Sequence, residues 1–171
     1  MVAGPMDYTQ GAMNNVIMKN FHAVYTEPMS QGTRCRQLAL YIVFDWPINM
    51  LCDAPTNYLK EEEWAKFIAS IPTVWEQTLP ISGKVAEHIV MAREKDGVWY
   101  VGGLTDWNAR DVEIDLSFLG KGEFNAEIFK DGINADRVGK DYKREVVRVS
   151  ADRKLKLHMA PGGGFVAKIT K

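Results

Sequence analysis

The sequence lacks an excess of charge of either sign, and it also lacks any long apolar run. Its 171 residues include 21 Lys and Arg against 22 Asp and Glu, for a formal net charge of −1. This balance excludes a broadly basic nucleic-acid binder, which would carry a clear excess of Lys and Arg. No apolar stretch approaches the roughly 18 residues that a membrane-spanning helix needs. We therefore expect neither a nucleic-acid partner nor a membrane span.

Cysteine and histidine are scarce, and neither is spaced for metal binding. The two cysteines, Cys35 and Cys52, form no CxxC motif, and no two of the three histidines have ligand spacing on one helix. We expect two buried free thiols and no metal or other cofactor in this chain.

The first positive charge is Lys19, so the sequence shows no basic region of a signal peptide. The chain as expressed is thus expected to be cytoplasmic.

The first half of the sequence has helical periodicity. Residues 33–44 repeat apolar side chains at helical spacing, and Thr33 is a candidate N-cap. Residues 59–70 predict a second helix with three glutamates near its start, where the helix dipole favours negative charge. Asn57 or Thr56 is the expected cap of this second helix.

Beyond Pro80 the apolar period falls to two, which predicts β-strands. Asp96-Gly97 separates two apolar runs and indicates a two-residue hairpin turn. The predicted strands cover residues 87–93, 98–104, 112–118, 124–129, 145–149, 155–159 and 165–169. Seven short strands at this spacing predict an antiparallel β-sandwich.

The first half is too short for the domain that it suggests. Met1-Val2-Ala3 followed by Gly4-Pro5-Met6-Asp7 is typical of a strand that ends in a polar loop, as at the ligand face of a (β/α)8 barrel. Such a barrel takes about 250 residues. The expected fold class is therefore an α+β composite, with the last β/α elements of a TIM barrel in residues 1–79 and an antiparallel β-sandwich in residues 80–171. An irregular α segment before the sandwich is the open alternative.

Six segments of the sequence are long and idiosyncratic enough to carry a family resemblance. They are VAGPMDYTQGAM (residues 2–13), GTRCRQLALYIVF (32–44), MLCDAPTNY (50–58), IPTVWEQT (71–78), GLTDWNARDVEIDLSFLG (103–120) and AEIFKDGINAD (126–136). Together they resemble glycoside hydrolase family 97, which comprises α-glucosidases and α-galactosidases. The resemblance implies an N-terminal β-sandwich, a central barrel and a C-terminal β-domain, of which this chain is the C-terminal portion.

The same resemblance implies where the chemistry of the intact enzyme lies. The family's catalytic carboxylates and calcium ligands lie upstream of the GPMDYT segment, so no catalytic residue is assigned here and the isolated chain is expected to be inactive. Calcium is implied for the inverting members, and export to the periplasm for the intact protein. The C-terminal sandwich is associated with support of the barrel and with homo-oligomerisation. Glucoside or galactoside specificity, and inversion or retention, stay open.

Asp7, Tyr8 and Thr9 are the best-placed candidates for contact with an oligosaccharide substrate. On the predicted barrel loop their side chains would hydrogen-bond sugar hydroxyls, whereas the alternative is that Asp7 caps the following turn. Glycoside hydrolysis uses a pair of carboxyl groups, and Asp7 supplies one. Where the two halves meet, Glu76 is expected to be structural and Trp75 to be a packing anchor between domains.

A second hypothesis treats the sandwich as a free-standing interaction or carbohydrate-binding module without catalysis. Its sugar platform would consist of Trp99, Tyr100, Trp107, Phe118, Phe124 and Phe129. Core packing is the alternative for these rings. Trp99 and Tyr100 point to opposite faces of one strand, so at most one of them is exposed. Trp107 is the better candidate for a sugar contact because it lies in a predicted loop.

Overall fold

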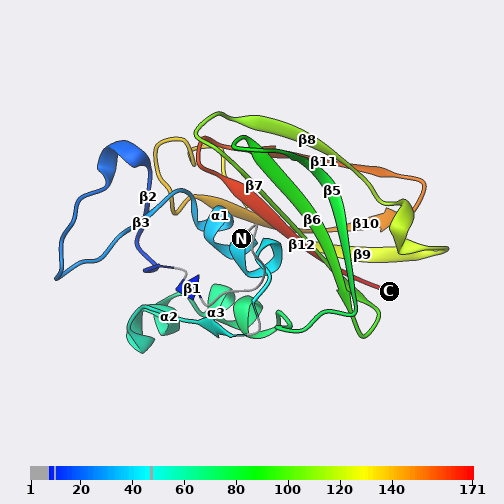
Figure 1. The fold of residues 1–171 in the computed structure, drawn as a ribbon, viewed down its shortest axis with the longest axis horizontal. Coiled ribbons are helices and arrows are strands. Elements are labelled where there is room, and N and C mark those ends of the chain that lie inside the picture. The colour runs from blue at the N-terminus through cyan, green and yellow to red at the C-terminus, as the bar shows by residue number, and fades with distance from the viewer. Residues whose placement is uncertain (1–7, 10, 47) are drawn as a thin grey trace.

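The computed structural model describes residues 8–9, 11–46 and 48–171. Its centre is a six-stranded antiparallel sheet in the order β10-β9-β12-β7-β6-β5 (Figure 1). The strands are β5 (Gln77–Lys84), β6 (His88–Lys95), β7 (Val98–Thr105), β9 (Glu123–Asp131), β10 (Tyr142–Ser150) and β12 (Gly164–Thr170). A two-stranded antiparallel sheet of β8 (Arg110–Asp115) and β11 (Lys154–Met159) forms the second layer. The predicted antiparallel β-sandwich is confirmed.

Turn chemistry sets the register of the central hairpin. Strands β6 and β7 pair from Lys95↔Val98 to His88↔Thr105. Between them, Asp96 and Gly97 both have positive φ, 51° and 77°. Two successive residues with positive φ are the mark of a type I′ turn, whose twist matches that of the flanking strands. The hairpin predicted from this dipeptide is confirmed.

Strand β5 is a finding that the sequence pattern did not predict, because Pro80 lies inside it. Proline cannot donate a ladder hydrogen bond, and it is tolerated at a sheet edge or a bulge. Here both conditions hold, since β5 is the edge strand and its register with β6 shifts between Pro80 and Ser82.

The strand predicted over residues 112–118 is too long. Strand β8 ends at Asp115, and Ser117–Leu119 form a 3-10 turn (η2). The Asp115 carboxylate accepts a hydrogen bond from the Ser117 N–H at 2.8 Å, which stabilises this turn. The apolar alternation persists because Leu116 and Leu119 still reach the core.

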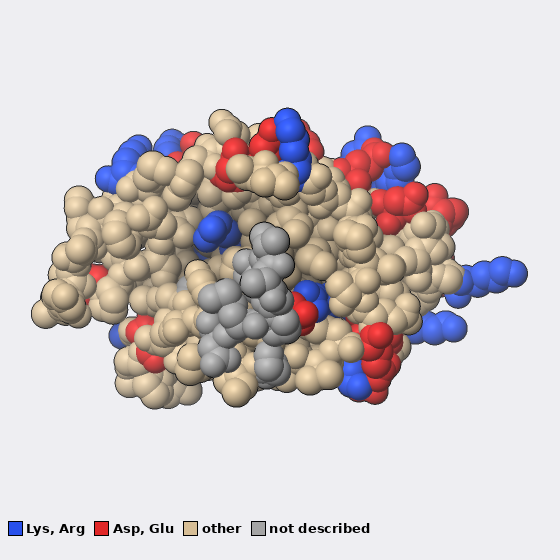
Figure 2. Space-filling model, in the orientation of Figure 1, with Lys and Arg blue, Asp and Glu red and all other residues tan. Residues whose placement is uncertain are grey.

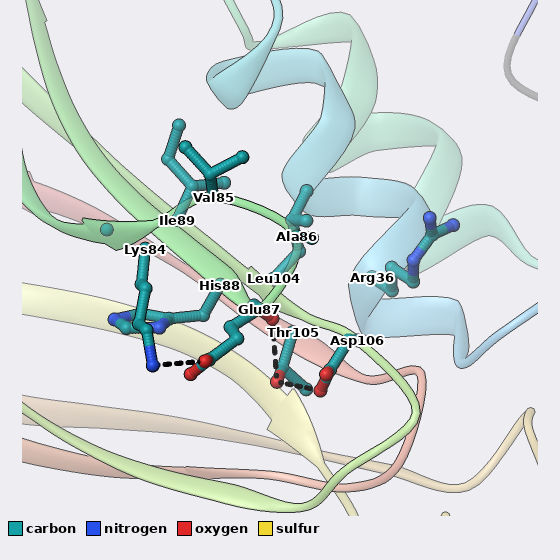
Figure 3. A pocket seen from close by; sticks show the side chains of 11 residues that line it. Arg36, Lys84, Val85, Ala86, Glu87, His88, Ile89, Leu104, Thr105 and Asp106 are labelled. Carbon is teal, nitrogen blue, oxygen red and sulfur yellow. Dashed lines mark hydrogen bonds and ion pairs between the residues drawn. The ribbon is translucent and has the colours of Figure 1, made fainter.

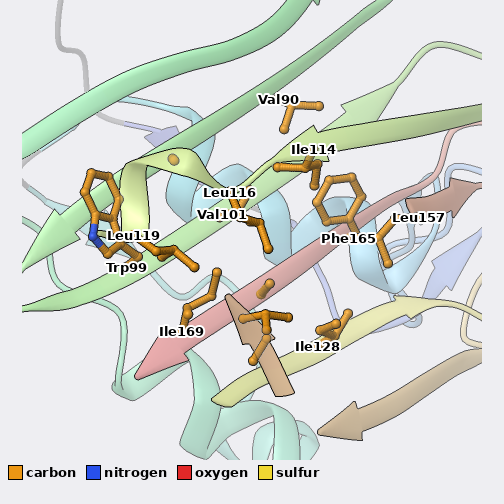
Figure 4. Close-up of a cluster of buried hydrophobic side chains, with 14 of the residues drawn as sticks. Val90, Trp99, Val101, Ile114, Leu116, Leu119, Ile128, Leu157, Phe165 and Ile169 are labelled. Atoms are coloured by element: carbon orange, nitrogen blue, oxygen red, sulfur yellow. The ribbon is translucent and has the colours of Figure 1, made fainter. Parts of the chain in front are cut away.

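The main hydrophobic core lies between the two sheets (Figure 4). The six-stranded sheet contributes Val90, Trp99, Val101, Ile128, Phe165 and Ile169 among others. The outer sheet contributes Ile114, Leu157 and Met159, all of them almost fully buried. Each fully buried side chain of this size contributes about 1.5–3 kcal/mol relative to an exposed one. This interface therefore holds the sandwich together.

Helix α1 (Arg34–Val43) confirms the first predicted helix. Its N-cap is Thr33, whose hydroxyl accepts a hydrogen bond from the Arg36 N–H at 3.1 Å. The helix packs on β12, β7 and β6, on the face of the large sheet opposite the outer sheet. Nearly all of its residues are buried, and Leu38, Ala39 and Ile42 have no exposed surface.

The second predicted helix is divided into α2 (Pro55–Lys60) and α3 (Glu62–Ala69). They meet at Glu61, whose φ of −116° and ψ of 50° lie outside the helical region. Helix α3 buries Trp64 and Phe67 against the large sheet, as the predicted apolar face requires.

The cap expected at Asn57 or Thr56 is wrong. Pro55 begins α2, with Ala54 at the N-cap and no side-chain hydrogen bond there. Proline suits the first helical position because its N–H would have no partner inside the helix and its φ is already helical. Both polar residues therefore lie within the helix and not before it.

Two short parallel strand pairs complete the fold. Strand β1 (Tyr8–Thr9) pairs with β4 (Asn49–Met50), and β2 (Asn15–Val16) pairs with β3 (Ser30–Gln31). The 3-10 turn η1 (Met18–Asn20) lies between β2 and β3. Parallel strands need a crossover, and α1 lies between β1 and β4 in the chain, as in a β/α barrel.

The composite fold class is thus confirmed, whereas the division at residues 79 and 80 stays a prediction. Within the described residues, no helix has the length and apolarity that a membrane crossing needs.

Candidate functional site

Strand β1, which pairs with β4, consists of two of the predicted substrate contacts. Tyr8 and Thr9 are exposed there, and Asp7 lies outside the described residues. The Tyr8 ring stacks on Trp46 with centroids 5.0 Å apart, and it meets Phe44 edge-on at 5.4 Å. A stacked ring with one open side presents its hydroxyl in a defined position, which suits a hydrogen bond to a polar ligand.

The segments after β1 and β4 are joined by hydrogen bonds. The Gly11 N–H donates to Cys52 Sγ at 2.7 Å, and the Met13 N–H donates to Asp53 Oδ2 at 2.6 Å. From α1, Gln37 Nε2 donates to the Gly11 carbonyl at 2.9 Å. The two loops and the helix therefore form one unit at this end of the strands.

The Asp53 carboxylate is the centre of this connection. Burial tends to raise its pKa, but hydrogen bonds from the Met13 N–H, the Asn57 side chain and the Ala54 N–H outweigh burial and hold the pKa below its ordinary value. Asp53 is thus ionised at neutral pH. Because its oxygens already accept these bonds, it acts as a structural acceptor here.

Arg34 is a buried cation beneath the same edge, with only 3% of its surface exposed. Its guanidinium donates to the Met13 carbonyl at 2.8 Å and to Asn15 Oδ1 at 3.3 Å, and it pairs with Glu61 Oε2 at 2.8 Å. A polar cavity of about 380 Å³ lies beside it. The cavity wall includes Asp53, Asn57, Lys60, Glu61 and Lys140.

Sequence reasoning missed Arg34 because the first turn of this helix is mostly polar, so a further charged residue there does not stand out. The available signal was its position directly after the N-cap Thr33, on a helix whose first turn holds no acidic residue. An arginine in that position is repelled by the positive end of the helix dipole. It therefore needs acceptors from elsewhere in the chain, and the Asn15 and Glu61 side chains provide them.

Residues 17–29, between β2 and β3, form an arm at the left of Figure 1. Part of this arm lines the cavity beside Arg34. The apolar side chains of the arm are unusually exposed: Met18, Phe21, Val24 and Tyr25. Figure 2 shows few charged side chains on this part of the surface. Exposed apolar groups gathered in one segment are typical of a contact surface.

A second hollow of about 510 Å³ lies between the β5–β6 turn, the end of β7 and the start of α1 (Figure 3). Its carboxylates, Glu87 and Asp106, are both engaged. Glu87 pairs with Lys84, and Asp106 accepts from the Asn108 N–H at 2.9 Å. The hydrogen bond from Lys84 lowers the pKa of Glu87. This hollow therefore offers no free acid–base pair.

The junction residues behave as the sequence predicts. Trp75 packs edge-on against Tyr100 with centroids 5.4 Å apart, and the Arg93 guanidinium lies 5.8 Å from the Trp75 ring centroid. Glu76 pairs with Lys95 at 2.5 Å. Trp75 thus joins the segment before β5 to the helix-covered face of the sheet.

The rings proposed as a sugar platform are dispersed in the structure. Trp99 and Tyr100 point to opposite faces, and both are buried, each in a different core. Phe124 and Phe129 are buried as well, and Phe118 packs on Trp99. Trp107 is 38% exposed. In the described part of the chain, these six rings form no continuous exposed surface.

The cysteine prediction is half right. Cys35 is buried on α1, where burial raises the pKa of its thiol well above the ordinary value. Cys52 is exposed, so the prediction of a second buried thiol is wrong. It lies in the loop after β4, where its sulfur accepts a hydrogen bond from the Gly11 N–H and stays exposed.

The calcium that the family resemblance implies has no cluster of carboxylate ligands among the described residues. Over residues 8–9, 11–46 and 48–171, no three His, Cys, Asp or Glu side chains are grouped to hold a metal ion. His158 Nδ1 lies 2.7 Å from Asp111 Oδ1, as a cross-strand pair on the outer sheet.

Comparison with known proteins gives consistent relatives. The family model described as "Glycosyl-hydrolase 97 C-terminal, oligomerisation" matches residues 74–170. A retaining alpha-galactosidase of Bacteroides thetaiotaomicron is 61% identical over 98% of this chain and 25% of its own length. A probable retaining alpha-galactosidase of Streptomyces bingchenggensis is 26% identical over 97% of this chain and 24% of its own length.

Solved structures of similar fold include a member of the same family. A glycoside hydrolase family 97 enzyme from Pseudoalteromonas sp. strain K8, in complex with acarbose, has a TM-score of 0.88 and 38% identity over 99% of this chain and 27% of its own. A beta-arabinopyranosidase at 24% identity, with a TM-score of 0.67 over 82% of this chain and 22% of its own, shows the fold alone. The chain spans about a quarter of the length of the curated relatives that it matches. With its family model, its sequence segments and its fold in agreement, the chain belongs to glycoside hydrolase family 97.

Proposed function

We propose that this chain serves as the C-terminal part of a retaining α-galactosidase, in which it supports the catalytic barrel and joins protomers. The observation that carries the activity is the 61% identity with the retaining alpha-galactosidase of Bacteroides thetaiotaomicron, which extends over 98% of the chain. The joining role is supported by the family model over residues 74–170, whose description includes oligomerisation.

The geometry supports a division of labour in the intact enzyme. Retaining hydrolysis needs two carboxyl groups about 5–5.5 Å apart. At the β1–β4 edge, the described carboxylate Asp53 is occupied by three hydrogen bonds. We therefore assign the reacting pair to the preceding part of the polypeptide, and to Tyr8 and Thr9 a contact with the sugar. Helix α1 would position this edge because it packs between the β1–β4 loops and the sheet.

The test of the activity compares nitrophenyl α-galactoside with nitrophenyl α-glucoside as substrates of the full-length protein. We expect faster turnover of the galactoside, with an α-anomeric first product in proton NMR. The 171-residue chain alone is expected to show no turnover above buffer. Preference for the glucoside, or an inverted product, would overturn the assignment. Turnover by the chain alone would place the reacting carboxylates within it.

The proposed sugar contact of Tyr8 predicts a defined kinetic effect. Tyr8→Phe in the full-length protein keeps the ring that stacks on Trp46 and removes only the hydroxyl. A lost hydrogen bond of about 0.5–1.5 kcal/mol corresponds to a rise of about two- to tenfold in KM for the galactoside. Tyr25→Phe is the matched control, because this tyrosine is fully exposed on the arm. An unchanged KM in Tyr8→Phe would remove Tyr8 from the substrate site.

A further inference from the structure

The two edge strands of the large sheet, β5 and β10, differ in how well their backbones could pair with another strand. Strand β5 forms one edge, and it contains Pro80 and a register shift at Ser82. Both features are devices that protect a sheet edge from pairing. Strand β10 forms the other edge. It pairs with β9 in unbroken register from Tyr142↔Asp131 to Ser150↔Glu123, and its nine residues include neither proline nor glycine.

The outer sheet is a poorer candidate for pairing with a second chain. Its two strands have six residues each. Its solvent face bears opposite charges in register, with Lys154 and Lys156 both paired to Glu113, at 2.5 and 3.4 Å. These side chains satisfy one another and stay hydrated. Among the described strands, β10 is therefore the longest regular edge without a partner on one side.

The charged side chains of β10 form ion pairs within the same chain. Lys143 pairs with Glu145 at 3.1 Å, within the strand. Arg144 is held by Glu127 at 2.7 Å and by Glu63 at 3.2 Å, on the neighbouring strand β9 and on α3. Charged side chains usually protect an edge by repelling an approaching strand. Here ion pairs with acids of the same chain weaken this repulsion.

Arg148 and Val146 complete the edge. Arg148 pairs with Glu123 of β9 at 3.6 Å, so its charge also has a partner in the same chain. Val146 lies at the middle of the strand and is 62% exposed. A β-branched apolar residue in this position favours strand pairing and gains from being covered.

We propose that β10 is the surface through which two copies of this chain associate, by antiparallel pairing of one β10 with the other about a two-fold axis near Val146. The large sheet would then continue across both protomers, and each copy would contribute the same surface, as a closed dimer requires. This inference rests on the proposed joining function, and it names the strand that performs it.

The experiment measures the mass of the full-length protein by size-exclusion chromatography with light scattering. In Val146→Asp, two carboxylates would meet across the axis, and we expect the mass to fall to half that of the wild type. Val85→Asp is the matched control because Val85 is 96% exposed on the β5–β6 turn, at the opposite edge. It should keep the wild-type mass.

A mixing experiment tests the two-fold contact directly. Val146→Lys is also expected to be monomeric, but a mixture of the Asp and Lys variants should regain the dimer mass. Circular dichroism establishes that both variants fold. If either variant does not fold, hydrogen exchange of the wild-type β10 amides replaces the mixing experiment. We expect these amides to exchange at least tenfold more slowly at dimer-forming concentration than after dilution.

The outcomes separate this inference from the function on which it rests. A dimer that persists in Val146→Asp, or β10 amides whose exchange does not depend on concentration, would overturn pairing through β10 and leave oligomerisation standing. A wild type that is monomeric at every concentration would overturn the joining function itself, and the inference with it.

Discussion

Replacing Phe129 by alanine is expected to lower the free energy of unfolding of the 171-residue chain by about 3–5 kcal/mol. Phe129 is 1% exposed and lies where the sheet meets α3. Its ring contacts Trp64 and Phe67, with centroids 5.7 and 4.8 Å apart. Its loss would leave a cavity between two layers that cannot both move to fill it, so the cost includes the cavity as well as the lost burial.

Urea denaturation followed by tryptophan fluorescence measures the effect, because Trp64 lies against the substituted ring. Val85→Ala is the control, since a side chain that is 96% exposed should change stability by less than about 0.5 kcal/mol. A loss below about 1 kcal/mol in Phe129→Ala would mean that α3 is not held to the sheet by this contact.

Asp131 is expected to make stability fall as the pH rises from about 4 to 6. Its Oδ2 accepts from the Ala160 N–H at 2.8 Å and the Gly164 N–H at 2.9 Å, and the Thr33 hydroxyl and the Cys35 thiol face the same buried carboxyl. Burial raises its pKa from 3.8 to about 6, although these bonds, the Thr33 hydroxyl and the nearby His158 act in the opposite direction.

The sign of the effect follows from proton binding. Below the unfolded pKa, Asp131 is protonated in both states, and its favourable contribution is complete. Between the two pKa values the folded state keeps a proton that the unfolded state releases, so rising pH favours unfolding. Above about pH 6 the contribution is lost. A shift of about two units corresponds to roughly 3 kcal/mol.

Comparison with Asp131→Asn isolates this group from other carboxylates. The difference in unfolding free energy, wild type minus variant, should fall by about 2.5 kcal/mol between pH 4 and pH 7. The thiol of Cys35, which also faces Asp131, stays protonated over this range because its own pKa is raised. Asp53→Asn is the control of opposite sign, since the pKa of Asp53 is lowered and its contribution is lost as the pH falls. A difference that does not depend on pH would refute the buried-carboxyl account.

Features that depend on residues close together in the sequence could be predicted from it. The turn at Asp96-Gly97 and the cap at Thr33 are examples, because their geometry is set by side chains within a few positions. Alternation also placed Trp99 and Tyr100 on opposite faces. It did not show that both faces are covered, because burial on the second face depends on α1, α2 and α3.

The wrong sequence predictions also concern features that depend on segments far apart in the chain. Pro80 is a strand residue because β5 is an edge, and edge position is a property of the assembled sheet. The helix over residues 59–70 divides at Glu61, which pairs with the buried Arg34 of α1. The edge leaves no local trace in the sequence, and the position of Arg34 after its N-cap indicates a need for acceptors without identifying Glu61 as one of them. The exposure of Cys52 likewise follows from where its loop lies in the fold.

At the candidate site, the sequence predicted Asp7, Tyr8 and Thr9 as sugar contacts. The structure places Tyr8 and Thr9 on the exposed strand β1, and their contact with a sugar stays a prediction. The sequence by itself determined the turns, the main strands, the first helix and the family resemblance, because these depend on short-range pattern. Only the tertiary structure decided the raised pKa of Asp131, the network around Arg34 and the free edge of β10. Each of these depends on which distant segments come together, and the free energies of burial and pairing are set by those long-range contacts.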